Sequence, residues 1–259
     1  MTKKKTIFHC FAGRKQYMEI QLHYMIKILN KYEFVSHYDI WNFAWTPEDR
    51  AWIRTLDTLH PKIRVRNAPD FGDAKRANNV ASKQFAYFFT KAYPVGQYYD
   101  YLFVKIDDDV VYIDVEKFDE FIDIRIDNPH AFLISADVIN NNLSIKNPTN
   151  LHMEFISNIK DITLKDLEVI KHPTENRLSI NFVSWLGSDL ESIEIEFGNG
   201  VGSDDEWRLC NTIPIKLNRK NLITKNFHCA HFSFGSQVNT KEFNQSELLM
   251  FYRTLLVQH

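Results

Sequence analysis

Three consecutive aspartates, Asp107, Asp108 and Asp109, follow the apolar run YLFVKI. The run is typical of a buried strand, and side chains alternate across a strand, so Asp107 and Asp109 are expected to point the same way and Asp108 the other. Two convergent carboxylates suit a hard divalent cation such as Mn²⁺ or Mg²⁺, which keeps part of its coordination shell for substrate phosphates. The alternative is a solvated acidic turn. The position at a strand end favours the metal site, because ligands bind outside the carboxyl ends of parallel strands.

The elements that would position this run alternate between strand-like and helix-like segments. Met18, Leu22 and Met25 recur at helical spacing, and Thr46 followed by Pro47 has the signature of a helix start. Strands are expected over residues 6–13, 33–45, 62–69 and 99–106, and helices over 15–32, 46–60 and 74–92. This alternation favours a mostly parallel sheet covered by helices.

The second half of the chain has a different character. Helices are expected over 115–126, over 203–211 and from about Lys241 onward, and strands over 131–139, 177–187 and 191–197. Residues 140–176 are polar with weak periodicity, and GNGVG at 198–202 is typical of a flexible link. No internal repeat is visible, so one domain is expected.

Composition excludes several classes of protein. The 259 residues are 44% hydrophobic with a formal net charge of -2, so no global electrostatic attraction to nucleic acid or to an anionic membrane is expected. The basic N-terminus resembles a signal peptide, but His9 and Gly13 interrupt its short apolar stretch, and no 18-residue apolar run occurs elsewhere. The three cysteines form no CxxC pair, which argues against a disulfide framework or a structural zinc site. A soluble cytoplasmic protein is expected.

A buried strand ending in D-x-D after an alternating first half resembles the GT-A class of nucleotide-sugar glycosyltransferases, especially small soluble members from chlorella viruses and bacteria. The resemblance implies an α/β, Rossmann-like fold with a central, mostly parallel sheet flanked by helices and a smaller mixed sheet on the acceptor side. It implies one domain over 1–259, with a nucleotide-sugar-binding half (1–115) and an acceptor-binding half (116–259) that ends in a helix.

The activity implied by this resemblance is metal-dependent sugar transfer. The donor would be a nucleotide-diphosphate sugar, with a UDP-sugar favoured, and the acceptor a glycan or another hydroxyl compound. Asp107 and Asp109 would hold Mn²⁺ or Mg²⁺. The protein would act in the cytoplasm, or in the host cytoplasm if it is viral.

The resemblance also assigns roles to the C-terminal stretch NFHCAHFSFGSQ. In many GT-A enzymes a late histidine completes the metal site and a following glycine-containing loop meets the diphosphate. His231 matches the ligand in order, and the expected diphosphate contacts are Gly235, Ser236 and Gln237. His228 faces the other side of a strand, so only one of the two histidines can bind the ion. The alternative for His231 is a hydrogen-bonded core residue.

In inverting members of the class, an acid at a late helix start takes the proton from the acceptor hydroxyl, and Asp205 matches that position. Asp204 and Glu206 are alternatives. The structural interpretation is a capping box formed by Ser203 and Glu206, since acids are favoured in any first helical turn.

The nucleotide pocket is expected beside FAGRK at the end of the first strand and along the helix AKRANNVASKQ. The helical residues lie at i+3 and i+4 spacings and share a face, although basic residues on a helix are more commonly just solvated. The expected nucleotide contacts are Ala12, Gly13, Arg14, Arg76, Asn79, Lys83, Asp107 and Asp108.

Two tryptophans, Trp185 and Trp207, are candidates to hold a sugar acceptor against an aromatic face, or else to belong to the core. A nucleotidyltransferase of similar fold is an alternative function, but FAGRK is a poor match to the glycine-rich, basic signature such an enzyme uses for a triphosphate. A non-catalytic carbohydrate-binding module explains the aromatic residues and leaves the acidic run without a role.

Overall fold

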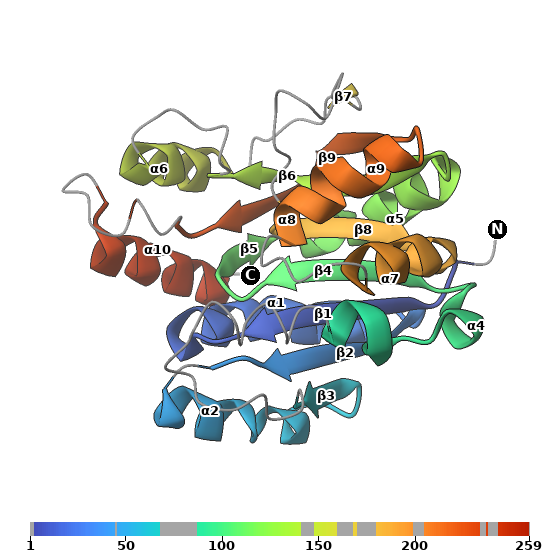
Figure 1. Cartoon of the computed structure of the whole chain (residues 1–259). Coiled ribbons are helices and arrows are strands. Elements are labelled where there is room, and N and C mark those ends of the chain that lie inside the picture. Colours follow the sequence, from blue (N-terminus) through green and yellow to red (C-terminus); the bar gives the residue numbers. More distant parts are fainter. Residues whose placement is uncertain are drawn as a thin grey trace.

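The first half of the chain forms parallel strands with helices between them (Figure 1). The computed structural model describes residues 3–44, 46–67, 87–140, 148–159, 168–169, 180–198, 205–233, 237 and 243–258. The strands are β1 (Thr6–Ala12), β2 (Val35–Asn42), β3 (Ile63–Arg66) and β4 (Leu102–Asp107). The helical segments are α1 (Lys15–Lys31), α2 (Pro47–Ile53), η1 (Leu56–Thr58), η3 (Phe88–Ala92) and α4 (Val95–Tyr98). Most of the helix expected over 74–92 lies outside the described residues.

The second half adds strands in both directions. The strands are β5 (Val110–Ile113), β6 (Ala131–Ile139), β7 (Glu168–Val169), β8 (Phe182–Leu186) and β9 (Lys220–His231). The helical segments are η4 (Val115–Lys117), α5 (Phe118–Asp127), α6 (Pro148–Asn158), η5 (Gly187–Asp189), α7 (Leu190–Gly198), α8 (Asp205–Trp207), η6 (Arg208–Thr212), α9 (Ile213–Lys216) and α10 (Gln245–Gln258).

All these strands belong to one sheet. Its order is β3-β2-β1-β4-β8-β6-β9-β5, with β7 beside β9. Strands β1, β2, β3, β4, β6 and β9 run in one direction, and β5, β7 and β8 run in the other. The predicted α/β class with a mostly parallel, helix-flanked sheet is therefore confirmed. The mixed part is continuous with the parallel part, where a separate smaller sheet was expected.

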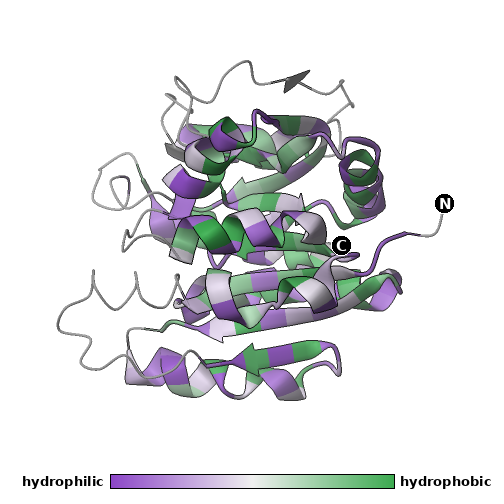
Figure 2. Cartoon of the chain, turned by 45° about the vertical axis from the view of Figure 1, so that its right-hand side comes forward, coloured by the Kyte–Doolittle hydropathy of each residue, from purple (hydrophilic) through white to green (hydrophobic). Residues whose placement is uncertain are grey.

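Both faces of the central strands are apolar, and a hydrophobic core covers each of them. One core joins α1, α5 and α10 to the sheet, with Met25, Phe118 and Leu248 among its buried residues. The other lies under η3, α7 and η6 and includes Phe88 and Trp185. Figure 2 shows the result, with hydrophobic strands inside and hydrophilic stripes on the outer sides of the helices.

The sequence predicted the start of helix α2 correctly, but it predicted a strand where the structure has helix α7. Helix α2 starts as predicted, because the Thr46 side chain accepts a hydrogen bond of 3.0 Å from the Asp49 amide and Pro47 is the first helical residue. The strand predicted over 191–197 is wrong, because this segment belongs to α7. Ile193 is fully buried and Ile195 is 56% exposed, whereas strand alternation would put both on one face. The repeating acidic residues mimicked the period of a strand.

The parallel strands bring their carboxyl ends to one edge of the sheet, where the arrowheads of β1, β4, β6 and β9 point the same way in Figure 1. Ala12, Asp107, Ile139 and His231 are the last residues of these strands. Side chains that follow them in the sequence therefore meet at this edge. In the described part of the chain, no helix is both long enough and apolar enough to span a bilayer.

The region behind His231 depends on a neutral buried histidine, His152 of α6. Its Nδ1 lies 2.6 Å from the Tyr252 hydroxyl and its Nε2 lies 3.0 Å from the carbonyl oxygen of Phe232. Burial lowers the pKa of His152 to about 4, from an ordinary value of 6.5. The unfolded chain therefore takes up this proton at a higher pH than the folded chain does, and stability falls as the pH drops through this interval.

We predict that the free energy of unfolding falls by about 2 kcal/mol between pH 7 and pH 5 on account of His152, since one unit of pKa difference corresponds to about 1.4 kcal/mol. Urea unfolding at both pH values should show a smaller decrease for His152→Gln than for the wild type. His130→Gln, at an exposed position, should keep the wild-type decrease. An equal decrease in His152→Gln and the wild type would contradict this assignment.

Candidate active site

Asp107, Asp109 and His231 converge at the carboxyl edge of the sheet. One potential ligand atom from each lies within 4.8 Å of the others. The Asp109 carboxylate is 3.1 Å from Nε2 of His231, and both side chains are buried, while the Asp107 side chain is 27% exposed. Two carboxylate oxygens and one imidazole nitrogen form a donor set that fits a divalent ion such as Mn²⁺. The partly exposed Asp107 leaves an open side for further ligands.

The middle aspartate, Asp108, binds the loop after β1. Its Oδ2 accepts hydrogen bonds from the backbone amides of Gly13 (2.8 Å) and Arg14 (2.9 Å), and its carboxylate also pairs with the Arg14 guanidinium. These contacts place a negative charge at the amino-terminal end of α1, where the helix dipole favours it. Asp108 is therefore separated from Asp107 as predicted, but the cause differs from the expected strand alternation, because β4 ends at Asp107 and Asp108 and Asp109 lie in the turn that follows.

Arg14 connects the two buried acids. Its guanidinium lies 3.0 Å from Asp109 as well as against Asp108, and it packs over the ring of Tyr17. Burial alone would lower the pKa of Arg14, but the two carboxylates raise it above its ordinary value. The side chain is nevertheless 45% exposed.

A hollow of about 550 Å³ opens beside the exposed part of Arg14. Its lining residues are Arg14, Lys15, Gln16, Glu19 and Asp49. The hollow therefore lies at the start of α1, next to the loop in which the sequence predicted nucleotide contacts.

Asp107 is held by three further residues. Lys105 forms an ion pair with its carboxylate, and Nδ2 of Asn181 donates a hydrogen bond of 2.7 Å to Oδ2. The backbone oxygen of Asp107 accepts a hydrogen bond from Nε2 of Gln21, which is itself fixed by the Tyr38 hydroxyl. Asp107 therefore has a defined orientation even though it is the most exposed of the three acids.

His231 is oriented from behind by Asn140. The backbone oxygen of Asn140 lies 3.3 Å from Nδ1 of His231, and its side-chain amide donates to the Phe232 carbonyl at 3.0 Å. The same side chain exchanges hydrogen bonds with Gln237. Asn140 has φ 60, a left-handed conformation that asparagine tolerates better than most residues. The Nε2 atom of His231 is thereby directed at Asp109.

The charge state of this pair follows from its surroundings. Burial would lower the pKa of His231, but Asp109 raises it above its ordinary value. Burial would conversely raise the pKa of Asp109, and His231 and Arg14 lower it. A metal ion that binds Nε2 would take the place of a proton there. His228 lies outside this cluster, with its Nδ1 3.2 Å from Asp137, as the strand alternation predicted.

Asp205, the predicted base, begins α8. Its carboxylate is close enough to contribute, after Asp107, to a raised pKa of Lys105 despite the burial of that lysine. Asp205 is therefore within electrostatic reach of the same edge. Asp204, one of its alternatives, lies outside the described residues.

The aromatic candidates differ in position. Trp207 is 50% exposed and follows Asp205 by two residues in α8. Trp185 is 1% exposed and stacks on Phe103 in the core, so it presents no face to an acceptor.

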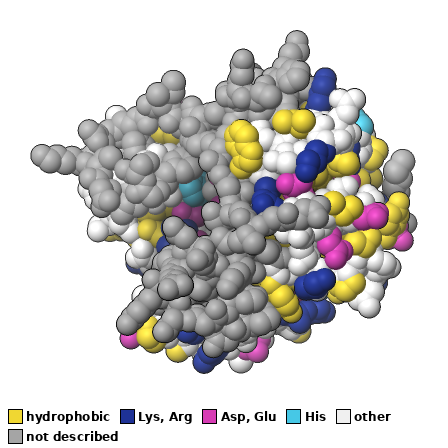
Figure 3. Space-filling view, in the orientation of Figure 1, with side chains coloured by type: hydrophobic (Ala, Val, Ile, Leu, Met, Phe, Trp, Pro, Cys, Tyr) yellow, Lys and Arg dark blue, Asp and Glu magenta, His cyan; other side chains and the backbone are white. Residues whose placement is uncertain are grey.

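Figure 3 shows that histidine and acidic side chains reach the surface together on the face that it draws.

Some predicted contacts lie outside the described residues: Arg76, Asn79, Lys83, Gly235 and Ser236. Gln237 is described, and it contacts Asn140. Ala12, 0% exposed, ends β1 directly before Gly13, whose amide is occupied by Asp108. These roles in binding nucleotide or diphosphate remain predictions.

Sequence reasoning missed Lys105, Asn181, Gln21 and Asn140. Lys105 could have been found, because it lies two residues before Asp107 and therefore on the same face of β4. The other three come from distant elements and carry no local signal.

No family model and no curated relative matches the sequence. Among solved structures, the chain is similar to a CMP:2-keto-3-deoxy-manno-octonic acid synthetase complexed with CTP (TM-score 0.49, 8% identity, 99% of both chains covered). It is also similar to a 4-diphosphocytidyl-2C-methyl-D-erythritol synthase (TM-score 0.47, 13% identity, 99% of both chains). A third similar structure is TarS 1-349 from S. aureus (TM-score 0.47, 12% identity, 96% of this chain and 70% of that chain). Similarity at this level does not carry a function over, because function depends on the side chains of the site.

The contacts of Asp108 predict a structural role. Asp108→Asn should lower the free energy of unfolding by about 1 kcal/mol, because it removes the charge that the Gly13 and Arg14 amides and the half-exposed Arg14 guanidinium contact. Urea unfolding in EDTA would measure this effect without any contribution from metal. Asp100→Asn, at a side chain that is 91% exposed, should change stability little. Wild-type stability of Asp108→Asn would contradict the structural role.

Proposed function

We propose that this protein is a metal-dependent glycosyltransferase. It would move a sugar from a nucleotide-diphosphate sugar, with a UDP-sugar favoured, to a hydroxyl group of a glycan or another acceptor. The observation that carries the proposal is the convergence of Asp107, Asp109 and His231 at the carboxyl edge of the sheet, where Asp109 also contacts the half-exposed Arg14. Ligands of open α/β sheets bind at this edge.

The donor side would be formed by the metal ligands and Arg14. A bound Mn²⁺ or Mg²⁺ would supply Lewis-acid stabilisation of the departing diphosphate. Asp107, Asp109 and His231 would hold the ion. Arg14, half-exposed at the hollow, would bind phosphate oxygens, and Ala12 and Gly13 would let the donor approach the backbone. Gly235, Ser236 and Gln237 would contribute further diphosphate contacts.

The acceptor side would be formed by α8. Asp205 would take the proton from the attacking hydroxyl, and Trp207 would offer an exposed aromatic face to the sugar acceptor. A hydroxyl that attacks from the face opposite the diphosphate, with Asp205 as its base, gives an inverted anomeric product. The electrostatic link between Asp205 and Lys105 supports a position near the donor site.

The proposal predicts slow, metal-dependent release of nucleotide from one nucleotide sugar, with water in place of the acceptor. Purified protein would be incubated with UDP-, GDP- and dTDP-sugars, with and without Mn²⁺, while free nucleotide is measured. Asp109→Ala should abolish the release, because it removes both a metal ligand and the partner of His231.

Three outcomes would contradict glycosyl transfer. Equal release with and without metal would contradict the role of the ion. Absence of release from every donor tested would contradict the proposed activity. Metal-dependent release of pyrophosphate from a nucleoside triphosphate in the presence of a sugar phosphate would instead identify a nucleotidyltransferase.

The assignment of Asp205 has its own test. Asp205→Asn should lower the rate of nucleotide release at least about a hundredfold, the usual contribution of a general base, and should leave Mn²⁺ affinity unchanged. The matched variant is Glu206→Gln, the next acid of the same helix, which should keep most of the wild-type rate. A large loss in Glu206→Gln with little loss in Asp205→Asn would identify Glu206 as the base.

A further inference from the structure

Lys105 is a buried lysine in the middle of the sheet. It lies in β4, pairs in register with His9 of β1 and Val183 of β8, and is 2% exposed. Its ammonium forms an ion pair with Asp107, donates a hydrogen bond of 3.2 Å to the carbonyl oxygen of Ile180, and lies over the ring of Phe11. A lysine is rarely buried to this extent unless it is paired with an acid.

The position of this charge matters because Lys105 contacts the carboxylate that the proposed metal ion would also use. The Lys105 ammonium contacts Asp107, the acid that is also one of the potential metal ligands. Arg14 already contacts both Asp108 and Asp109. A bare divalent ion would therefore enter a cluster of three acids whose charge is offset by two permanent cations, at a distance where like charges repel strongly in a buried site.

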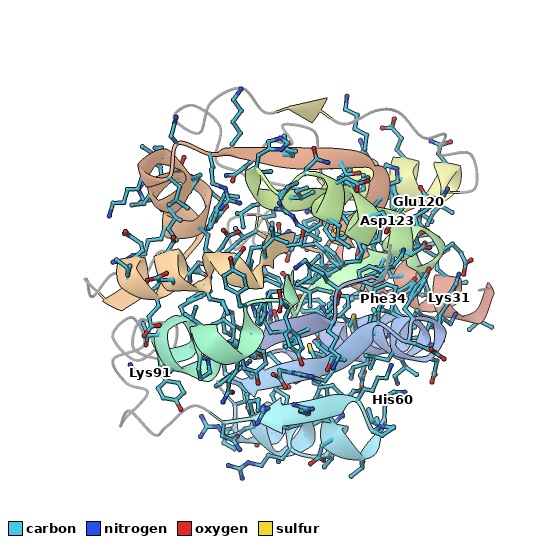
Figure 4. The ribbon with its side chains drawn as sticks, turned by 90° about the vertical axis from the view of Figure 1, so that its right-hand side faces the viewer. Lys31, Phe34, His60, Lys91, Glu120 and Asp123 are labelled. Atoms are coloured by element: carbon cyan, nitrogen blue, oxygen red, sulfur yellow. The ribbon has the colours of Figure 1, made fainter. Side chains whose placement is uncertain are left out.

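The surface lysines differ from Lys105. Figure 4 labels Lys31 and Lys91 on the outside of the molecule, and their side chains are 40% and 65% exposed and pair with acids at the surface. Such pairs exchange readily with water and contribute little. Lys105 has no comparable access to solvent, so its charge acts on Asp107 with little screening.

Resting on the metal site of the proposed function, we propose that Lys105 is a positioning residue that competes with the divalent ion for Asp107 and so weakens metal binding by the free protein. It orients Asp107 before the ion arrives and must share this carboxylate afterwards. An ion that arrives together with a diphosphate brings compensating negative charge and meets less repulsion. Lys105 thereby couples metal binding to donor binding.

The test is the affinity for Mn²⁺ alone, measured from the electron paramagnetic resonance signal of the free ion. Lys105→Met keeps an unbranched side chain that is one atom shorter and removes the charge. It should bind Mn²⁺ at least about tenfold more tightly than the wild type, because a unit charge close to the ion is removed from a site of low dielectric constant. Equal or weaker binding would overturn the proposal.

Two further variants make the result specific. Lys117→Met removes a lysine that pairs with Glu120 away from the cluster, and it should leave Mn²⁺ affinity unchanged. In an Asp107→Asn background, Lys105→Met should increase the affinity by clearly less than in the wild-type background, because the shared carboxylate is gone and only the direct repulsion between Lys105 and the ion remains. An undiminished increase in that background would contradict competition for Asp107.

Two more measurements distinguish the role of Lys105 from a folding defect and from failure of the proposed function. Circular dichroism in EDTA would verify that each variant is folded, and Lys105→Gln, which is also uncharged, serves if Lys105→Met does not fold. Tighter Mn²⁺ binding without any donor hydrolysis would support the role of Lys105 and contradict the glycosyltransferase. Absence of Mn²⁺ binding in the wild type and in both Lys105 variants would overturn the role of Lys105 and the metal site together.

Discussion

The repulsion among Asp107, Asp108 and Asp109 is the constraint on which this edge of the sheet depends. Two cations offset this repulsion: Arg14 forms ion pairs with Asp108 and Asp109, and Lys105 forms one with Asp107. Because Arg14 follows β1 and its partners Asp108 and Asp109 follow β4, their ion pairs also fix the loop after β1 to the end of β4. The same contacts that stabilise the acids therefore position the residues that face the hollow.

The three acids consequently have different roles. Asp108 is committed to backbone amides and to Arg14, whereas Asp107 and Asp109 share a space with His231. Among the three acids, Asp108 and Asp109 are buried and Asp107 is 27% exposed, so the described part of the cluster is open on the side of Asp107. An arrangement with two fixed sides and one open side suits an ion that completes its coordination shell with substrate oxygens.

The sequence predicted those parts of the molecule whose signals are local. The alternation of strands and helices and the cap at Thr46 both follow from neighbouring residues. Residues 191–197 were mispredicted because alternating acids carried the period of a strand while burial followed that of a helix. Asn181 and Asn140 could not be predicted, because strands β8 and β6 bring them to the site from distant positions in the chain.

The central claim is that a divalent ion occupies the space between two acids and one histidine at this edge. The most direct measurement is an anomalous difference map, recorded at the manganese absorption edge, from crystals grown with Mn²⁺ and UDP. The account predicts one strong peak within coordination distance of Asp107, Asp109 and His231, next to the diphosphate. A map with clear nucleotide and no peak there, or with the peak at another position on the protein, would contradict it.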